Sequence, residues 1–279
     1  MSDPRRTVLI TGASAGIGRC FAEVFAEHAF DTVLVARRRE RLDLLAADLE
    51  RRFGGSHRAF PLDLALPDAP ADLEERLAAD GVVVDALVNN AGYGIDGSFS
   101  DIPWEELDAF LRVLLVSQAE LCRRFLPGMR ERGWGRVINV ASLAAYVPPR
   151  PGDSYSATKA FLVRLSKSLA LEHRGTGVHV TAVCPGFTHT EFHEAMGIAD
   201  QAARLPRWLW MDAETVARQG YDAVMRGRIV LINGWRNRLL AGIAALIPDS
   251  LVYALSPKGA LEKRKGRRPA PPSSPKGES

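Results

Sequence analysis

A glycine-rich turn near the N-terminus restricts the possible folds of this chain more than any other feature. The turn has the pattern Thr-Gly-x-x-x-Gly-x-Gly over 11–18, between an apolar run and an amphipathic stretch. Gly12 allows a tight turn, Gly16 lets the backbone approach a pyrophosphate, and Gly18 lets a helix pack closely on a strand. The turn therefore predicts a dinucleotide site that includes Ser14 and Ile17. The alternative is a glycine loop that only connects two elements.

The rest of the chain alternates short β-branched runs with longer amphipathic stretches, as a parallel sheet flanked by helices does. Strands are expected over 7–10, 32–36, 57–62, 86–89, 136–140, 179–183 and 228–232. Helices are expected over 18–28, 40–53, 71–79, 104–132, 154–173 and 213–226. This alternation predicts an α/β fold, a single Rossmann-like doubly wound parallel sheet of seven strands flanked by helices. The 279 residues suffice for one such domain, expected over 1–257.

Charge, cysteine content and hydropathy argue against several other classes of protein. The net charge is only +3 and much of the basic excess falls in 258–268, so no nucleic-acid partner is expected. The three cysteines are widely separated without metal-ligand spacing, which fits a reducing, cytoplasmic compartment. A strand-like run begins at Thr7, so no signal peptide is expected. The longest apolar run, Leu239 to Ile247, is far shorter than the ~20 residues of a membrane-spanning helix.

A tyrosine and a lysine, Tyr155 and Lys159, are four residues apart within a helical pattern, so both lie on one helix face. The ammonium is expected to lower the pKa of the phenol and let Tyr155 pass a proton near neutral pH. Ser142 ends the fifth expected strand, thirteen residues before Tyr155. Its hydroxyl can point into the same cleft and hydrogen-bond a substrate carbonyl oxygen. An isolated Tyr-x-x-x-Lys pattern is usually only a solvated helix face.

Three further motifs lie where expected strands end, which is the ligand-binding edge of such a sheet. Arginines occupy 37–39 after the second strand, where an acidic residue would repel a 2′-phosphate. Arg37 first, and Arg38 second, therefore favour NADP(H) over NAD(H). Asp63 and Leu64 follow the third strand, and Asp63 can accept from an adenine amino group. The fourth strand ends in Asn-Asn-Ala-Gly, which supplies Asn90, Ala91 and Gly92 to the predicted site but is equally often turn chemistry.

Together these motifs resemble the classical short-chain dehydrogenase/reductase family over roughly 6–235. The resemblance implies that Tyr155 is the general acid/base, that Lys159 lowers its pKa and holds the nicotinamide ribose, and that Ser142 orients the carbonyl. It also implies that Pro185, Gly186 and Thr188 border the nicotinamide ring. Members of the family commonly form dimers or tetramers, so a homodimer or homotetramer is expected.

One position departs from the family pattern in a way that affects the mechanism. Family members usually carry an asparagine midway along the helix before a Leu-Pro-x-Met turn, where it helps to hold a water behind the lysine. Counting back from 126–129 puts Leu114 at that position, and leucine offers water no hydrogen bond. We expect a proton relay rerouted through Ser117 or backbone carbonyls, or a slow turnover.

The interval 187–212 corresponds to the substrate lid of the family. Trp208 and Trp210 within it suggest a bulky apolar substrate, although tryptophans that only pack the lid onto the core are the alternative. His189 and His193 are four apart, as metal ligands on a helix are, but their only acidic neighbours are two glutamates and no metal is expected.

The C-terminal part contains an apolar stretch over 239–255 and then a basic, Pro/Ser-rich tail over 258–279 that is expected to be disordered. The apolar stretch fits a cleft cover, a subunit interface or, with the basic run, peripheral contact with an anionic membrane.

The function expected from these features is an NADP(H)-dependent oxidoreductase that acts on a carbonyl compound or a secondary alcohol. The alternative is a nucleotide-binding regulatory or scaffold protein of the same fold, which Leu114 favours and the intact set of Ser142, Tyr155 and Lys159 disfavours.

Overall fold

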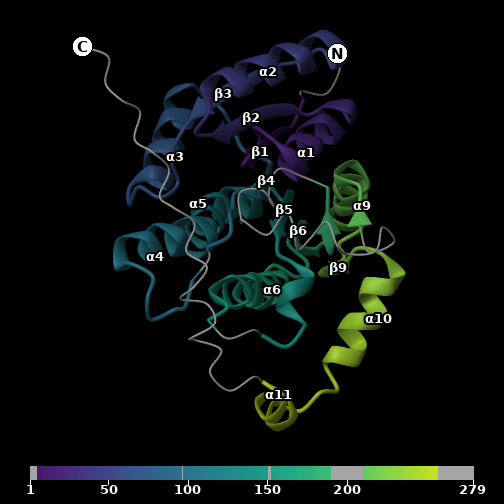
Figure 1. Cartoon of the computed structure of the whole chain (residues 1–279). Coiled ribbons are helices and arrows are strands. Elements are labelled where there is room, and N and C mark those ends of the chain that lie inside the picture. The colour runs from purple at the N-terminus through teal and green to yellow at the C-terminus, as the bar shows by residue number, and fades with distance from the viewer. Residues whose placement is uncertain (1–4, 96, 150–151, 190–209, 257–279) are drawn as a thin grey trace, which may run out of the picture.

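A parallel sheet of seven strands forms the centre of the molecule in the computed structural model, which describes residues 5–95, 97–149, 152–189 and 210–256 (Figure 1). The strand order is β3-β2-β1-β4-β5-β6-β9, and every neighbouring pair is parallel. The strands are β1 (Thr7–Thr11), β2 (Asp31–Ala36), β3 (His57–Pro61), β4 (Ala86–Asn89), β5 (Gly135–Val140), β6 (Val178–Cys184) and β9 (Val230–Ile232). The order reverses between β1 and β4, and ligands bind at such a reversal. The predicted doubly wound sheet is confirmed.

Helices cover both faces of the sheet because alternate strand residues point to opposite sides. On β1, Val8 and Ile10 pack in the core beneath α1 (Gly16–Glu27), α2 (Arg39–Phe53) and α9 (Ala213–Met225). Leu9 points the other way, towards α3 (Ala69–Ala79) and α5 (Ser117–Glu131). Helix α6 (Ser154–Glu172) lies on this second face against β5 and β6. Both faces of the sheet are therefore covered by apolar contacts. The central strands accordingly consist of β-branched apolar runs and not of alternating apolar and polar residues.

The stretch 104–132 is not the single continuous helix that its pattern predicts. The structure divides it into α4 (Trp104–Leu111), a π-helical turn (Arg112–Val116) and α5. The backbone N–H of Ser117 donates to the carbonyl of Arg112, five residues earlier. A π turn accommodates one extra residue per turn and often occurs at functional sites. Here it contains Leu114, whose side chain is fully buried.

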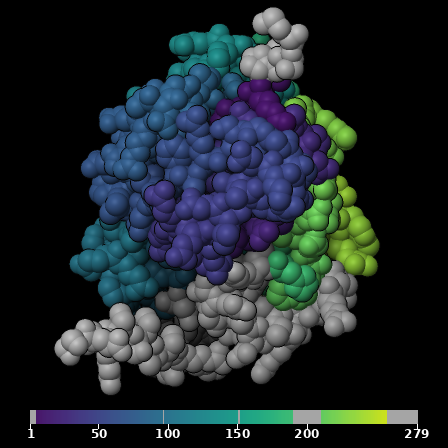
Figure 2. Space-filling model, turned by 90° about the horizontal axis from the view of Figure 1, so that it is seen from above, coloured from purple at the N-terminus to yellow at the C-terminus, as the bar shows by residue number. Residues whose placement is uncertain are grey.

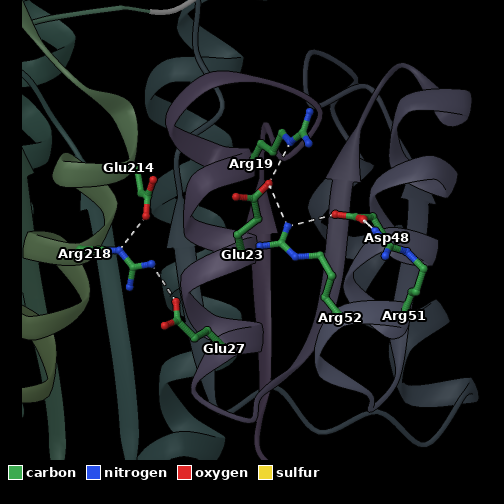
Figure 3. Close-up of polar contacts among 8 residues, drawn as sticks. All are labelled: Arg19, Glu23, Glu27, Asp48, Arg51, Arg52, Glu214 and Arg218. Carbon is green, nitrogen blue, oxygen red and sulfur yellow. Dashed lines mark hydrogen bonds and ion pairs between the residues drawn. The ribbon is translucent and has the colours of Figure 1, made fainter.

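Exposed ion pairs connect α1 to the helices on either side of it (Figure 3). Glu23 of α1 lies 3.9 Å from Arg52 of α2, and Glu27 of α1 lies 2.9 Å from Arg218 of α9. Arg218 also pairs with Glu214 at 2.8 Å. Single exposed pairs contribute less than about 1 kcal/mol each. As a network they keep α1, whose N-terminus follows the glycine turn, in register with its neighbours.

The remaining elements lie towards the C-terminus and were not predicted as helices or strands. A two-stranded sheet joins β7 (Phe187–Thr188) to β8 (Trp210–Met211), and two helices follow β9, namely α10 (Trp235–Ala244) and α11 (Asp249–Leu255). Seen from the α2 side in Figure 2, the first part of the chain forms one continuous surface and α10 lies at its margin. Among the described helices none alone is long and apolar enough to cross a membrane. Only α10 and α11 taken together are, and they are bent by 91°.

Candidate active site

The glycine turn between β1 and α1 has the close packing that its sequence predicts. A Cβ at Gly12, where φ is +67°, would lie 2.9 Å from the Cα of Ala91. A Cβ at Gly18 would overlap the carbonyl oxygen of Gly12. No side chain of the described residues caps α1, so its first amides are not used by a capping group. The backbone at this turn thus fits an anionic group that approaches the start of the helix.

Asn90 fastens the end of β4 to the glycine turn. Its side-chain Nδ2 donates to the carbonyl oxygens of Thr11 at 3.0 Å and Gly12 at 3.3 Å. Its backbone N–H donates to the Thr11 hydroxyl at 3.0 Å. The preceding Asn89 is fully buried and donates to Asn139 of β5 instead. The two asparagines therefore have different roles, and Asn90 is the one that belongs to the site.

The arginines after β2 separate into different environments. Arg38 donates from Nη2 to the Ser14 hydroxyl of the glycine turn, 3.2 Å away. Arg37 lies close enough to Tyr93 for its positive charge to oppose the burial that raises the pKa of that phenol. Arg39 pairs with Asp43 one helical turn later. The geometry thus puts Arg38 beside the glycine turn and Arg37 further along the sheet edge, whereas the sequence analysis ranked Arg37 first.

Two hollows lie near the sheet edges. One, of about 320 Å³, borders the glycine turn and is lined by Ser14, Gly16 and Arg41, among others. The other, of about 570 Å³, is at the amino ends of the strands beside Arg58 and Trp134. The larger hollow is at the opposite sheet edge from Ser142 and Tyr155, and its residues share none with the predicted site. The predicted site residues therefore gather at the carboxyl edge and not at the larger of these two hollows.

The residues that follow β3 and β4 lie at the carboxyl edge of the sheet. The Asp63 carboxylate accepts from the backbone N–H of Ala65 at 3.0 Å. Leu64 is buried, and its carbonyl accepts from the Ser117 hydroxyl at 2.8 Å. A Cβ at Gly92 would lie 3.7 Å from the Lys159 ammonium and 3.6 Å from Leu114. The Leu114 side chain and the Lys159 ammonium therefore both border the space beside Gly92.

Ser142, Tyr155 and Lys159 come together from two elements. Ser142 follows β5, and Tyr155 and Lys159 lie in the first two turns of α6. Asp153 caps this helix by accepting from the Ser156 backbone N–H at 3.0 Å. The Ser142 side chain hydrogen-bonds Tyr155, and the Lys159 nitrogen lies 5.5 Å from the Tyr155 ring centroid. The shared helix face expected from the four-residue spacing is present.

The pKa values differ from the sequence-based expectation. Burial raises the pKa of Tyr155 to about 12, although its hydrogen bond with Ser142 acts in the opposite direction. Burial also lowers the pKa of Lys159 to about 8. For the chain by itself the pKa of Tyr155 therefore shifts opposite to the expected direction, because burial has the largest effect on it. The Lys159 ammonium donates to the Val140 carbonyl at 2.8 Å and lies 5.5 Å from the centroid of the phenol ring. That Lys159 lowers the pKa of Tyr155 when a coenzyme is bound stays a prediction.

Ser117 and Lys159, the polar groups of the expected proton relay, both donate to backbone carbonyls. The Ser117 hydroxyl donates to the Leu64 carbonyl and the Lys159 ammonium to the Val140 carbonyl, each at 2.8 Å. Leu114 is fully buried near Lys159 and presents no polar atom. A relay through Ser117, a relay through backbone carbonyls and a slow turnover all stay predictions.

Sequence reasoning missed Gln118, which is fully buried one helical turn after Leu114. Its Nε2 donates to the Ala91 carbonyl at 2.8 Å, whereas its Oε1 has no partner among the described residues. A polar residue four positions after Leu114 on an apolar face is the signal that could have revealed it.

The predicted nicotinamide border lies after β6. The Pro185 carbonyl accepts from the Leu143 backbone N–H at 2.9 Å. A Cβ at Gly186 would lie 2.5 Å from Nδ2 of Asn237, a residue of α10 that sequence reasoning did not connect with the site. Thr188 is buried and donates to the Gly186 carbonyl at 3.1 Å. Leu143, which follows β5, and Asn237 of α10 thus both contact this segment.

Aromatic rings lie at both ends of the predicted lid. The His189 ring stacks on Trp210 with centroids 4.5 Å apart, and Phe187 lies 5.9 Å from the same tryptophan. Trp208 and His193 lie outside the described residues, so their predicted roles stay predictions. The stacking of His189 on Trp210 gives this histidine a packing role.

Comparison with known proteins agrees with this geometry. Residues 6–200 match the family described as short chain dehydrogenase. A ketoacyl reductase (HetN) from Nostoc sp. is 35% identical over 65% of this chain, and the match spans 63% of that relative, less than two thirds of its length. A short-chain dehydrogenase from Sphingobium yanoikuyae, solved in complex with NADPH, is 32% identical with a TM-score of 0.76, covering 91% of this chain and 97% of its own. A bulky-bulky ketone specific alcohol dehydrogenase from Comamonas testosteroni is 28% identical with a TM-score of 0.72, covering 92% and 98%. The chain belongs to the short-chain dehydrogenase family of oxidoreductases.

Proposed function

We propose that the protein is an NADP(H)-dependent oxidoreductase that transfers a hydride between nicotinamide and a carbonyl compound or secondary alcohol. The observation that carries the proposal is the grouping of Ser142, Tyr155 and Lys159 at the edge of the sheet where the glycine turn also lies. A nucleotide reaching from that turn to Gly92 would bring its ring to Tyr155.

The residues present fit such a dinucleotide. The glycine turn, with Ser14, Gly16 and Ile17, would hold the pyrophosphate, and Asp63 and Leu64 would border the adenine. Ala91 and Gly92 would line the central part, and Lys159 would hold the nicotinamide ribose. Pro185, Gly186 and Thr188 would border the ring. The nicotinamide supplies the hydride when reduced and a positive charge beside the phenol when oxidised.

The pKa of Tyr155, raised to about 12, means that the phenol keeps its proton at pH 7. It can give that proton to a carbonyl oxygen as negative charge develops there. Ser142 can hold the same oxygen and stabilise that charge. Both groups can therefore act in carbonyl reduction.

A bulky apolar ketone is the substrate class that the surroundings support. Phe187 and Trp210 present aromatic surface at the ends of the lid interval. The similar Nostoc protein is named a ketoacyl reductase and the similar Comamonas enzyme is specific for bulky-bulky ketones. Assays should therefore use a panel of ketones and 3-oxoacyl compounds with NADPH and, separately, with NADH. NADPH oxidation with at least one of them is expected.

The panel also tests the alternative function, a nucleotide-binding regulatory protein. The specific observation in its favour is the fully buried Leu114 next to Lys159, where family members usually have asparagine. Saturable NADPH binding in a titration, combined with no oxidation across the whole panel, would replace the enzyme proposal with this one.

The contact of Arg38 with the glycine turn leads to a prediction about coenzyme choice. Arg38→Ala is expected to weaken NADPH binding about tenfold and to change NADH binding by less than about twofold, since one charge-assisted bond to the 2′-phosphate is lost. Fluorescence titration with both coenzymes measures this. Arg39→Ala, one residue further, removes a charge that is paired with Asp43 and serves as the control. If Arg38→Ala weakened the binding of NADPH and NADH equally, this would contradict the assignment of Arg38 to the 2′-phosphate. If Arg37→Ala weakened NADPH binding more than Arg38→Ala, Arg37 would be the main contact, as the sequence analysis expected.

The apolar contact behind Lys159 leads to a prediction about proton transfer. Leu114→Asn introduces a hydrogen-bonding group beside Gly92, which the Lys159 ammonium also borders, and should change the turnover number and shift its pH profile. The buried amide is also expected to lower the free energy of unfolding by about 1–3 kcal/mol. Leu114→Met keeps the contact apolar and is the control. Turnover and pH profile identical in all three proteins would show that proton transfer does not depend on this contact.

A further inference from the structure

Helix α10 has its apolar pattern turned outward. The residues that it buries are the small or polar Asn237, Ala241 and Ala244. Its large apolar side chains, and those of the turn after it, are exposed: Trp235, Leu239, Leu240, Ile243, Leu246 and Ile247. A helix on the surface of a globular protein normally buries its large apolar residues and exposes polar ones. The outward face of α10 therefore indicates a surface that binds a partner.

Helix α11 continues this apolar surface. None of its residues is buried, and Leu251, Tyr253 and Leu255 are exposed by 47%, 86% and 76%. The two helices lie beyond β9 at the margin of the molecule, bent by 91° to each other (Figure 1). We call the exposed apolar residues of 235–255 the C-terminal apolar surface. Contiguous apolar surfaces of this kind mark sites of interaction with proteins or membranes.

The charged residues within and after 235–256 in the sequence indicate the kind of partner. Within 235–256 the charged residues are Arg236, Arg238 and Asp249. The next twelve residues, 257–268, contain six lysines and arginines and one glutamate. Apolar side chains flanked by clustered basic residues are the combination that binds anionic lipid surfaces. The apolar part enters the interface, and each lysine or arginine near it contributes about 1 kcal/mol.

We propose that the C-terminal apolar surface docks peripherally on a membrane that contains anionic lipids. A second copy of this chain fits less well, although a homodimer or homotetramer through another surface is compatible with the proposal. A two-fold contact through α10 and α11 would join two copies of the same surface. It would bring a second Arg236 and Arg238 into that interface, and like charges repel. A bilayer with anionic headgroups complements both the apolar and the basic residues.

The base of α10 connects this surface with the candidate active site. Asn237 donates to the Asn233 carbonyl at 2.8 Å and lies 3.5 Å from the sulfur of Met211, near the end of the lid interval. Its Nδ2 also packs against Gly186. A docked membrane would therefore lie on the same helix that borders the nicotinamide segment. If the proposed function holds, an apolar ketone can reach the site from the bilayer.

Cosedimentation of the full chain with vesicles tests the docking independently of turnover. The protein is expected to sediment with vesicles of phosphatidylcholine and phosphatidylserine, and much less with phosphatidylcholine alone or in high salt. The double variant Ile243→Asp/Leu246→Asp should bind the anionic vesicles at least about tenfold more weakly, because two apolar contacts become charged. Arg236→Gln/Arg238→Gln should weaken binding about tenfold and only to anionic vesicles.

Leu66→Asp/Leu171→Asp is the matched control. It adds the same two charges at leucines that are 58% and 68% exposed outside the C-terminal apolar surface, and should bind vesicles like the unchanged protein. NADPH titration of each variant shows whether the fold is intact. The proposal is overturned if the unchanged protein does not sediment with anionic vesicles, or if the Ile243/Leu246 variant binds them equally well. A lower oligomeric mass of that variant with unchanged vesicle binding would identify the surface as a subunit interface and also overturn it.

Discussion

Tyr155→Phe is expected to lower the rate of ketone reduction about 100- to 10,000-fold, the usual contribution of a positioned general acid. The phenol is the group that hydrogen-bonds Ser142, and its pKa, raised to about 12, keeps it protonated at neutral pH. Phenylalanine preserves the ring over which Lys159 lies, so the packing changes little. NADPH affinity should therefore stay within about twofold. Single-turnover and steady-state rates with the best ketone of the panel, together with an NADPH titration, measure both effects.

A second tyrosine supplies the control for this experiment. Tyr221 is 8% exposed and stacks on His28 between α1 and α9, far from Ser142. Tyr221→Phe removes the same oxygen atom from a buried phenol and should leave the turnover number unchanged. A Tyr155→Phe enzyme that reduces ketones at the rate of the unchanged protein would end the assignment of Tyr155 as proton donor, even if the protein proves to be an oxidoreductase.

The sheet was predictable from sequence because its strands are short, β-branched and buried on both faces. Each of the seven predicted strands is present, with ends that differ by no more than two residues, as for 136–140 against Gly135–Val140. The site could be predicted for a similar reason, because parallel strands bring the residues after their carboxyl ends to one edge. Gly92 and Ser142 are far apart in sequence and reach the same edge for that reason.

The remaining features depend on side-chain contacts that no periodic pattern encodes. The π turn that contains Leu114 does not interrupt the helical spacing of the apolar residues in 104–132. The apolar pattern therefore predicted one continuous helix. The ranking of Arg37 over Arg38 followed the order of residues, whereas the direction of each side chain decides which one reaches Ser14. Helix α10 escaped prediction as a helix because its apolar residues occupy the exposed face and leave small residues for the core.

Two opposing effects act on the pKa of Tyr155. The spacing to Lys159 indicates an attractive charge, but the structure adds burial, which disfavours both charged groups. Burial has the larger effect on each: the pKa of the phenol rises to about 12 and that of the ammonium falls to about 8. Sequence spacing alone contains no information on desolvation, so the direction of the shift was not predictable from it.

Replacement of Lys159 is the second change with a large expected effect, and it should raise stability while it lowers activity. Lys159→Met is expected to lower ketone reduction at least about 100-fold, through the loss of the group that would hold the nicotinamide ribose beside Tyr155. The same change should stabilise the fold at pH 7. Lys159 is 3% exposed, and a pKa lowered from 10.5 to about 8 means that the folded state carries its charge at a cost of about 3 kcal/mol. The lost hydrogen bond to Val140 offsets about 1 kcal/mol of the gain.

The pH dependence of this gain identifies its cause. Below pH 8 the lysine is protonated in the folded and the unfolded chain, so the burial cost is fully present and the methionine variant has its full advantage. Between about pH 8 and 10.5 the unfolded chain binds more protons at this site than the folded chain, and the unchanged protein gains stability as the pH rises. The advantage of Lys159→Met should therefore shrink over this range. The raised pKa of Tyr155 acts in both proteins and largely cancels from the difference.

Denaturant unfolding at pH 7, 9 and 10 measures the difference in free energy directly. A net gain of about 2 kcal/mol corresponds to a melting temperature raised by roughly 4–8 °C at pH 7. Lys167→Met, on the same helix but partly exposed, removes an ammonium without relieving comparable burial and should change stability by less than about 0.5 kcal/mol. If Lys159→Met were destabilised at pH 7, the folded protein would have to solvate or pair this ammonium well enough to offset its burial. The charged Lys159 would then stabilise the sheet edge. Its burial would not lower stability for the sake of the reaction.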